Sequence, residues 1–242
     1  MQPIMEVVPD TNPTKKILII GKAPSSMSDA PCSDTSWDVW TLSDMVMLKQ
    51  VPRCTLHFEL HSYDFMVGRG ESQPQYLEWL KQKHDFPIIC SEHIKEFPSC
   101  VLFPKVEIVE RFGTYFSNTV SWMIALAIQK GATDIGIYGV DMAAGDAEYT
   151  GQRPSCEYFM GWAKGLGINL IVAEHSDLLK TRGLYGFDSD LNEMHKKWAS
   201  RQAEMQERYN KTRQQRDQSA VDAAYYKGAL EAQGYYAQWM YR

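Results

Sequence analysis

Residues 17–20 form an unbroken aliphatic run, Ile17-Leu18-Ile19-Ile20, and Gly21 follows it directly. A run without polar alternation is typical of a strand buried on both faces, as in a parallel sheet covered by helices. Gly21 then allows a sharp turn, and the hydroxyls of Ser25 and Ser26 lie beside backbone amides that can receive a phosphate. Two interpretations stay open: a plain strand-to-helix connection or a loop that binds a nucleotide.

This loop matches neither of two common phosphate-binding patterns. It lacks G-x-G-x-x-G, and it lacks G-x-x-x-x-G-K-[ST]. The sequence therefore indicates neither a standard dinucleotide-binding fold nor a P-loop NTPase.

Six further β-rich runs alternate with amphipathic segments over residues 16–185: WDVWTLSD, TLHFEL, FPIIC, VEIVE, DIGIYGVD and INLIVAE. This alternation predicts an α/β, Rossmann-like, doubly wound and mostly parallel sheet. Such sheets bind ligands outside the carboxyl ends of their strands. We therefore expect four segments to gather at one edge: Gly21 to Ser26, Ser43 with Asp44, Glu59 to His61, and Gly139 to Met142.

The clearest crossover runs from Tyr115 to Met142. Ser117 or Asn118 can cap a helix in which apolar residues recur at helical spacing, and Gly131 is expected to end it. The next buried strand is predicted over Ile135 to Gly139.

Two segments outside this domain differ in composition. Residues 1–15 are expected to form a flexible N-terminal arm. Residues 186–242 contain no proline, have a long charged and Gln-rich run, and predict a helical hairpin with a break near Gln218 to Ala220. The segment between Asp188 and Gln218 carries seven Lys/Arg and six Asp/Glu, which make a mixed-charge surface and not a nucleic-acid surface. We therefore expect the hairpin to serve docking or homo-oligomerisation.

Composition narrows the protein class. The net charge of −5 gives no global attraction to nucleic acid or to an anionic membrane. The five cysteines are widely spaced without a C-x-x-C pair, so reduced thiols are expected in place of a zinc ribbon or a disulfide framework. No apolar stretch reaches the roughly 18 residues that a membrane span needs, and a cytoplasmic location is expected.

The stretches ILIIGKAPSS and TVSWMIALAIQKGATDIGIYGVDM resemble two signatures of the bacterial lipooligosaccharide sialyltransferase family. The first resembles its G-x-G-P-S loop, and the second its small-residue helix followed by a strand that ends in G-[IV]-D. The same signatures occur in related Rossmann-like proteins of the MptE-like, 6-hydroxymethylpterin diphosphokinase type, several of them carried by phages. The resemblance covers about residues 16–175 and implies a phage-encoded member of this superfamily.

In these sialyltransferases the first loop and the region after the second strand bind the cytidine nucleotide of a CMP-sugar. By position, the resemblance implies nucleotide contacts from Gly21, Lys22, Ala23, Pro24, Ser25, Ser43, Asp44, Ser117, Asn118, Thr119 and Gly139, with Asp141 at the pocket wall. Lys22 and Ala23 depart from the usual family residues. The lysine adds a possible charge-assisted contact to phosphate, and the alanine restricts how closely the backbone approaches.

The family also places a histidine base and paired tyrosines after the G-[IV]-D loop. Residues 143–174 lack that histidine, and His175 comes only later, after the last predicted strand. Glu157 is the candidate replacement base, since a partly buried carboxylate can be tuned toward neutral pH, and Asp141 is the second catalytic candidate. The phosphate-binding candidates in this region are Tyr149, Arg153 and Tyr158, with a helix expected to start near Ser155 and offer its free amides to an anion.

Structural roles compete with these assignments. Asp141 can cap the loop after its strand, and Arg153 can form an ordinary salt bridge in place of an anion contact. Cys156 is expected to be structural.

The sequence thus predicts a nucleotide-binding, glycosyltransferase-like enzyme that uses a CMP- or other nucleotide-activated sugar. No metal ligands are implied. One alternative is an MptE-like pyrophosphoryl transferase that needs Mg²⁺ and carboxylates such as Asp141 and Asp146. The other is a non-catalytic nucleotide-binding or assembly protein, which the absent histidine and the added helical segment favour.

Overall fold

The computed structural model describes residues 15–68, 74–142, 147–181, 184, 187 and 192–240, with the backbone alone for 147–150, 192–197, 238 and 239. The chain divides into two compact units, residues 1–180 and 181–242. Of the predicted N-terminal arm, residues 1–14 lie outside the described residues.

The first unit is built on a seven-stranded sheet in the order β5-β4-β3-β2-β1-β6-β7. Every neighbouring pair of strands is parallel. The predicted Rossmann-like α/β sheet is confirmed. The strands are β1 (Lys16–Ile20), β2 (Trp37–Leu42), β3 (Leu56–Glu59), β4 (Ile88–Cys90), β5 (Cys100–Leu102), β6 (Asp134–Tyr138) and β7 (Asn169–Val172).

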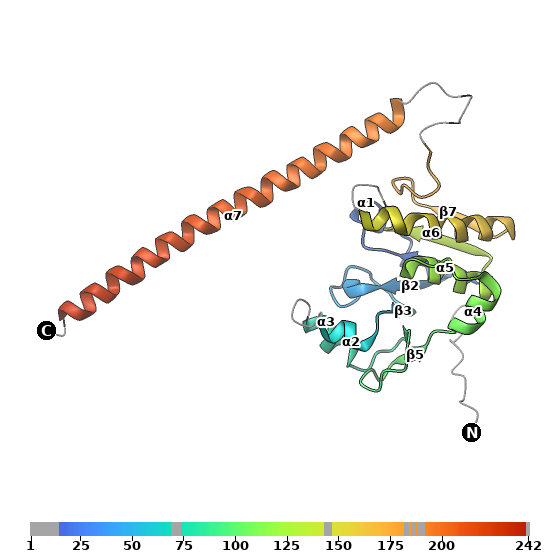
Figure 1. Cartoon of the computed structure of the whole chain (residues 1–242), viewed down its shortest axis with the longest axis horizontal. Helices are drawn as coiled ribbons and strands as arrows, with labels where there is room; N and C mark the ends of the chain where they lie inside the picture. The colour runs from blue at the N-terminus through green and yellow to red at the C-terminus, as the bar shows by residue number, and fades with distance from the viewer. Residues whose placement is uncertain are drawn as a thin grey trace. The chain divides into compact units, whose positions relative to one another are not determined.

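Alternate residues of the strands point to opposite faces of the sheet, and both faces are packed against apolar cores. One face carries Ile17, Ile19 and Phe58 and packs against α4 (Lys105–Phe112), α5 (Thr119–Gln129) and α6 (Ala147–Gly165). Figure 1 shows α5 and α6 running side by side over the sheet.

The other face has two smaller cores. Ile88 and Cys90 of β4 pack against α2 (Tyr63–Gly68) and α3 (Pro74–Leu80). Leu18, Ile20 and Val39 are covered near α1 (Pro24–Met27) and the 3-10 helix η1 (Ser43–Met45). The central strands are therefore buried on both sides, as the aliphatic run 17–20 predicts.

The α5 crossover agrees with its sequence signals. Asn118 is the N-cap, and its side-chain oxygen accepts a hydrogen bond from Ser121 N at 2.9 Å. Gly131 follows the helix with φ of +74°, a conformation that glycine adopts without strain.

The VEIVE segment is helical, so the prediction of a strand there is wrong. It belongs to α4, and the strand lies just before it at β5. The spacing explains the difference, because Ile108 and Phe112 are buried four residues apart while Val106 is 65% exposed. That is the burial pattern of a helix and not of a strand.

The helix that was expected to start near Ser155 is longer than predicted. α6 begins at Ala147 and includes Pro154 in its interior. Ser155 is therefore not at a free helix N-terminus, and the predicted anion site on its amides is wrong. The helix continues past the proline because Cys156, Phe159 and Met160 are fully buried against the sheet, which compensates for the backbone hydrogen bond that proline cannot donate.

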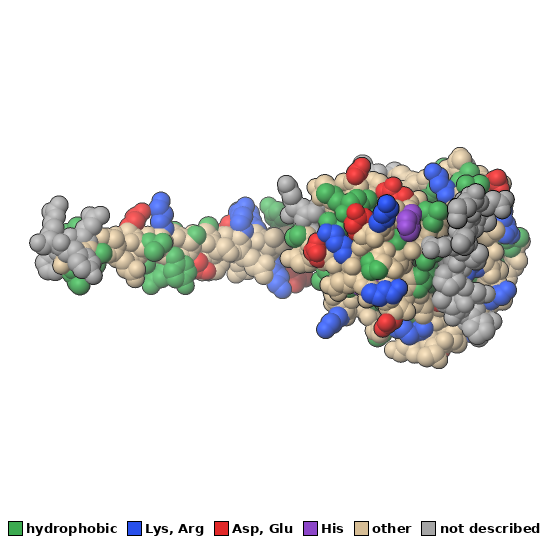
Figure 2. Space-filling view, turned by 90° about the horizontal axis from the view of Figure 1, so that it is seen from below, with side chains coloured by type: hydrophobic (Ala, Val, Ile, Leu, Met, Phe, Trp, Pro, Cys, Tyr) green, Lys and Arg blue, Asp and Glu red, His purple; other side chains and the backbone are tan. Residues whose placement is uncertain are grey.

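In the second unit the described residues from 192 to 240 form a single helix, α7 (Asn192–Met240), where the sequence predicts a hairpin. The hairpin prediction is wrong because the segment from Gln218 to Ala220 holds neither glycine nor proline. The side chain of Gln218 instead donates to Asp222 at 2.9 Å, one turn further along the same helix. Figure 2 shows hydrophobic side chains interspersed with charged ones along this helix. Tyr225 and Tyr226 are exposed on it.

No helix of the described residues is long and apolar enough to cross a membrane.

Candidate functional site

The loops after β1 and β6 touch through their backbones. Gly21 N donates to Tyr138 O at 2.8 Å, and Ala23 N donates to Gly139 O at 2.7 Å. A Cβ on Gly21 would lie 2.3 Å from Gly139 O, so no side chain fits there. Gly139 itself has φ of +64°. Two glycines thus let the two loops meet.

This meeting point is the topological switch of the sheet. From β1 the chain crosses to β2 on one side, and from β6 it crosses to β7 on the other side. In open α/β sheets the crevice outside the carboxyl ends of two such strands is the usual place for a ligand.

Side chains join three strand ends at this crevice. Ser25 Oγ donates to Asp141 Oδ2 at 2.6 Å, and Ser26 Oγ accepts from Gly139 N at 2.9 Å. Lys22 forms an ion pair with Asp44 after β2. The structure therefore brings the loop after β1 together with the predicted residues after β2 and β6.

Two non-glycine residues at this edge have left-handed backbone conformations. Ser43 has φ of +59° and Met142 has φ of +46°, directly after β2 and soon after β6. Such conformations are uncommon for side-chain-bearing residues and tend to occur at ligand sites.

A pocket of about 90 Å³ lies beside the crevice, at the ends of β2 and β3. Its wall is largely apolar, with a few polar groups near the strand ends, as is usual for small-molecule sites. The lining residues are Leu42, Ser43, Phe58, Glu59, His61, Phe65, Met66, Tyr76, Leu77, Leu80 and Thr119.

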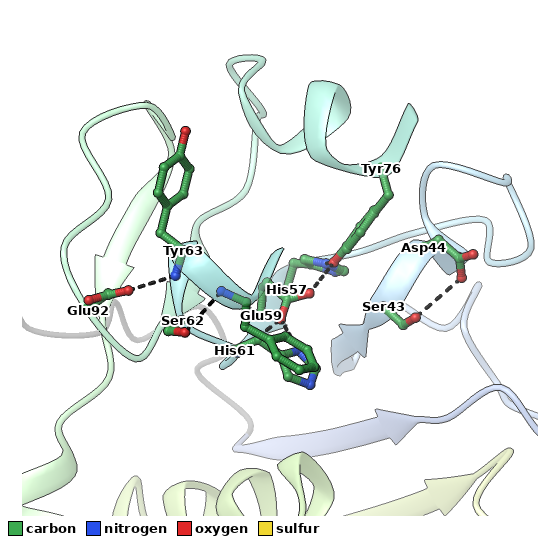
Figure 3. Close-up of polar contacts among 10 residues, drawn as sticks. Ser43, Asp44, His57, Glu59, His61, Ser62, Tyr63, Tyr76 and Glu92 are labelled. Atoms are coloured by element: carbon green, nitrogen blue, oxygen red, sulfur yellow. Dashed lines mark hydrogen bonds and ion pairs between the residues drawn. The ribbon is translucent and has the colours of Figure 1, made fainter. Parts of the chain in front are cut away.

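A chain of hydrogen bonds runs from the sheet interior to this pocket (Figure 3). Thr41 Oγ1 and His57 Nδ1 are 2.9 Å apart, and His57 Nε2 lies 2.9 Å from the Tyr76 hydroxyl. Tyr76 donates to Glu59 Oε2 at 3.0 Å. The other Glu59 oxygen, Oε1, is 2.6 Å from His61 Nδ1 and also accepts from His61 N at 3.1 Å.

The electrostatics of this network keep Glu59 ionised. Burial raises the pKa of the Glu59 carboxyl, but the hydrogen bonds and the charge of His61, together with the Tyr76 hydroxyl, outweigh burial and hold the pKa below its ordinary value. Burial and the neighbouring Glu59 carboxylate raise the pKa of Tyr76 well above its ordinary value, so Tyr76 stays a phenol. Burial lowers the pKa of His57 to about 4, so His57 is neutral.

The predicted residues at the start of α5 lie close to α6. Ser117 Oγ is 2.7 Å from Ser155 Oγ, and Asn118 Nδ2 donates to Gln152 O at 2.9 Å. Cys156 Sγ contacts the Asn118 side chain at 3.2 Å and is fully buried, in agreement with a structural role. Thr119 lines the pocket.

Arg153 and Glu157 contact each other on α6. Arg153 Nε donates to Glu157 Oε1 at 2.8 Å, and Arg153 Nη2 donates to Lys180 O at 2.9 Å. Glu157 Oε1 also accepts from Leu179 N at 2.8 Å. These bonds are the salt-bridge alternative for Arg153, and the roles of both residues in binding or catalysis stay predictions.

The two candidate tyrosines differ in what the structure describes. Tyr158 is 47% exposed, and its ring lies 5.5 Å from that of Tyr115. The side chain of Tyr149, like Asp146 of the magnesium alternative, lies outside the described residues.

Sequence reasoning missed Tyr76 and Thr41 as parts of the site. Glu59 and His61 could be placed at the edge because they follow a predicted strand. Tyr76 lies in the helical segment PQYLEWL, where an aromatic residue is more often part of the core, and nothing in the sequence indicates that its hydroxyl reaches Glu59.

Comparison with known proteins gives only remote likenesses. No protein-family model and no curated protein matches the sequence. Solved structures with a similar fold include the sialyltransferase CstII from Campylobacter jejuni in complex with the substrate analogue CMP-3FNeuAc, which is 17% identical with a TM-score of 0.44 over 65% of this chain and 79% of that chain.

Two further structures from Campylobacter jejuni are similar at the same level. An α-2,3-sialyltransferase in apo form is 16% identical with a TM-score of 0.44, over 69% of this chain and 78% of that chain. The monofunctional α-2,3-sialyltransferase Cst-I is 14% identical with a TM-score of 0.43, over 82% of this chain and 98% of that chain.

Proposed function

We propose that the chain binds a nucleotide at the β1–β6 crevice and transfers a sugar from a CMP- or other nucleotide-activated donor to an acceptor. The observation that carries the proposal is the contact between the loops after β1 and β6, where the Gly21 and Gly139 backbones meet and Ser25 reaches Asp141. The motif resemblance supports the proposal, because it implies that the first of these loops binds a cytidine nucleotide and that the G-[IV]-D loop lies beside it.

The geometry supports a division of roles around the crevice. Lys22 is 42% exposed while paired with Asp44, so its ammonium group is accessible to an incoming phosphate. Ser25 and Asp141 offer a hydroxyl and a carboxylate for a ribose or a sugar hydroxyl. A cationic side chain near the leaving phosphate stabilises the charge that develops there during transfer.

A binding experiment tests this proposal. The purified protein is titrated with CMP, CDP, UDP, ADP and GDP by calorimetry and thermal shift, with and without Mg²⁺. Ligand at 100 times Kd stabilises the folded state by roughly 2.7 kcal/mol, which is readily detected. We expect a shift with CMP that does not depend on Mg²⁺.

The variant Ser25→Trp places a large ring in the crevice and should abolish CMP binding. Ser28→Trp is the matched control, because Ser28 is also exposed in this loop and its side chain donates to the neighbouring Asp29 and not to Asp141 or Gly139 of the crevice. Unchanged CMP affinity in Ser25→Trp contradicts the crevice assignment. Mg²⁺-dependent ATP turnover would favour the pyrophosphoryl transferase, and no response to any nucleotide would favour an assembly protein.

A further inference from the structure

The hydrogen-bond chain at the pocket has a defined direction. Because the ionised Glu59 carboxylate only accepts hydrogen bonds, His61 must carry its proton on Nδ1, which faces Glu59 Oε1 at 2.6 Å. On the other side, Tyr76 donates to Glu59 Oε2, so His57 donates from Nε2 to the Tyr76 oxygen and accepts from Thr41 at Nδ1. In this series of hydrogen bonds, the buried Thr41, His57 and Tyr76 each donate to an acceptor.

This direction determines the chemistry of His61. A neutral imidazole with its proton on Nδ1 has its basic lone pair on Nε2. Glu59 is 5% exposed, so its negative charge is little screened and stabilises the imidazolium that forms when Nε2 takes a proton. The pair has the geometry of a base with its orienting carboxylate.

The position of His61 suits proton exchange with a ligand. Its side chain is half exposed, whereas Glu59 behind it is buried, and both line the pocket. The His61 ring stacks on Phe65 at 4.7 Å, which fixes its plane at the pocket wall.

The pocket is next to the proposed nucleotide loop. Ser43 lines the pocket, and the following residue, Asp44, is the ion-pair partner of Lys22 after β1. Thr119, the first residue of α5, also lines the pocket. A hydroxyl held in the pocket therefore lies beside the place where we propose that the donor binds.

We propose that His61, oriented by Glu59, is the general base of the transfer, and that the pocket at the ends of β2 and β3 binds the acceptor. The assignment rests on the proposed function and replaces Glu157 as the base. The acceptor class is a hydroxyl compound with an apolar face beside the reacting group, because Leu42, Phe58 and Leu77 line the pocket around the Glu59–His61 pair.

In this step the acceptor oxygen forms a bond to the anomeric carbon of the donor sugar. The bond between that carbon and the phosphate oxygen breaks, and its electron pair leaves with the nucleotide. The acceptor proton passes to His61 Nε2, and the half-exposed imidazolium later releases it to water. Glu59 is a positioning residue: it holds the Nδ1 proton and keeps its own charge.

The test compares turnover and nucleotide binding in the full chain. Release of CMP from CMP-N-acetylneuraminic acid is measured with lactose and with p-nitrophenyl galactoside as acceptors, and Kd for CMP is measured by calorimetry. General-base catalysis typically contributes about 10²–10⁴-fold. We expect His61→Gln to lower kcat by that factor with Kd for CMP unchanged within about twofold.

Three variants separate a base from a structural residue. His61→Ala opens space for an imidazole molecule, and added imidazole should restore CMP release in this variant alone. Glu59→Gln should keep CMP binding but move the acid limb of the kcat profile to lower pH, since the imidazolium loses its carboxylate. Glu157→Gln tests the rival base, and its kcat is compared with that of His61→Gln.

Several outcomes overturn the assignment. These are retained kcat in His61→Gln, no imidazole rescue of a folded His61→Ala, or loss of kcat in Glu157→Gln alone. CMP binding to the wild-type chain without CMP release with either acceptor also overturns it. Absence of nucleotide binding by the wild type is a different result, because it refutes the proposed function itself.

Discussion

Ser25 Oγ donates a 2.6 Å hydrogen bond to Asp141 Oδ2, although 116 positions separate the two residues in the chain. The bond exists because β1 and β6 are neighbours in the sheet and their following loops cross at Gly21 and Gly139. The candidate crevice therefore depends on two glycines that carry no chemistry of their own.

Gly21→Ala should destabilise the fold strongly. The added Cβ would lie 2.3 Å from Gly139 O and 2.8 Å from a Val140 methyl carbon, and the backbone oxygen cannot move without breaking the Ala23–Gly139 hydrogen bond. Overpacking of this kind costs about 1–3 kcal/mol, and a backbone clash belongs at the upper end. Urea unfolding of the two proteins measures the difference.

Gly161→Ala is the matched control for that substitution. Gly161 lies within α6, and nothing lies within 4 Å of the position that a Cβ would take. Alanine should stabilise the helix there by about 0.5–1 kcal/mol. If Gly21→Ala were as stable as Gly161→Ala, the close approach of the two loops would be refuted.

Much of the sheet could be predicted because its strongest signals are local. The aliphatic run at Ile17 to Ile20 and the capped helix from Thr119 to Gln129 each carry their own start and stop residues. The edge to which the loops gather follows from parallel strand order alone. Ser43, Glu59 and Asp141 could thus be placed near one another without coordinates.

The errors arose where local signals are weak or compete. VEIVE alternates like a strand, but Ile108 within it and Phe112 after it are buried at helical spacing. The sequence predicts a helix start near Ser155, yet packing of Phe159 and Met160 retains a longer helix that passes through Pro154. The Tyr76–Glu59 bond joins an α3 side chain to β3, and no pattern along the chain encodes such a tertiary contact.

Stability should fall between about pH 6.5 and pH 4 because of His57. The unfolded state protonates His57 near 6.5, whereas burial holds the pKa in the folded protein at about 4. The folded state therefore binds fewer protons in this window, and the stability present above pH 6.5 is lost as the pH falls to 4. A shift of this size corresponds to roughly 3 kcal/mol.

The measurement is the free energy of unfolding in urea at several pH values for wild type and His57→Gln. Glutamine keeps a donor and an acceptor at this buried position but does not titrate. The free energy of unfolding of His57→Gln should therefore depend less steeply on pH, by a slope that corresponds to at most one proton. His175→Gln is the matched control, because it also removes one imidazole but at an exposed position. Equal slopes for wild type and His57→Gln would show that His57 is not held neutral by burial.

Tyr76→Phe should destabilise the protein and also loosen the Glu59 carboxylate that orients His61. Without the hydroxyl, Glu59 Oε2 loses a donor and His57 Nε2 loses its acceptor, both in buried surroundings. Leaving such groups unsatisfied costs about 1–3 kcal/mol each. Tyr115→Phe, at a side chain that is 53% exposed, should change the urea midpoint little.

A proline at position 220 should separate a continuous α7 from a hairpin. Ala220 lies well inside α7, and the hydrogen bond from Gln218 to Asp222 spans it. Ala220→Pro would remove a backbone hydrogen bond of the helix and clash with the preceding turn. Together these effects cost about 3 kcal/mol. We expect a loss of ellipticity at 222 nm relative to the wild type, while Ala220→Gln keeps the signal because glutamine is a good helix former. In a hairpin with a turn at residues 218–220 the proline would be tolerated, and the two variants would give the same spectrum.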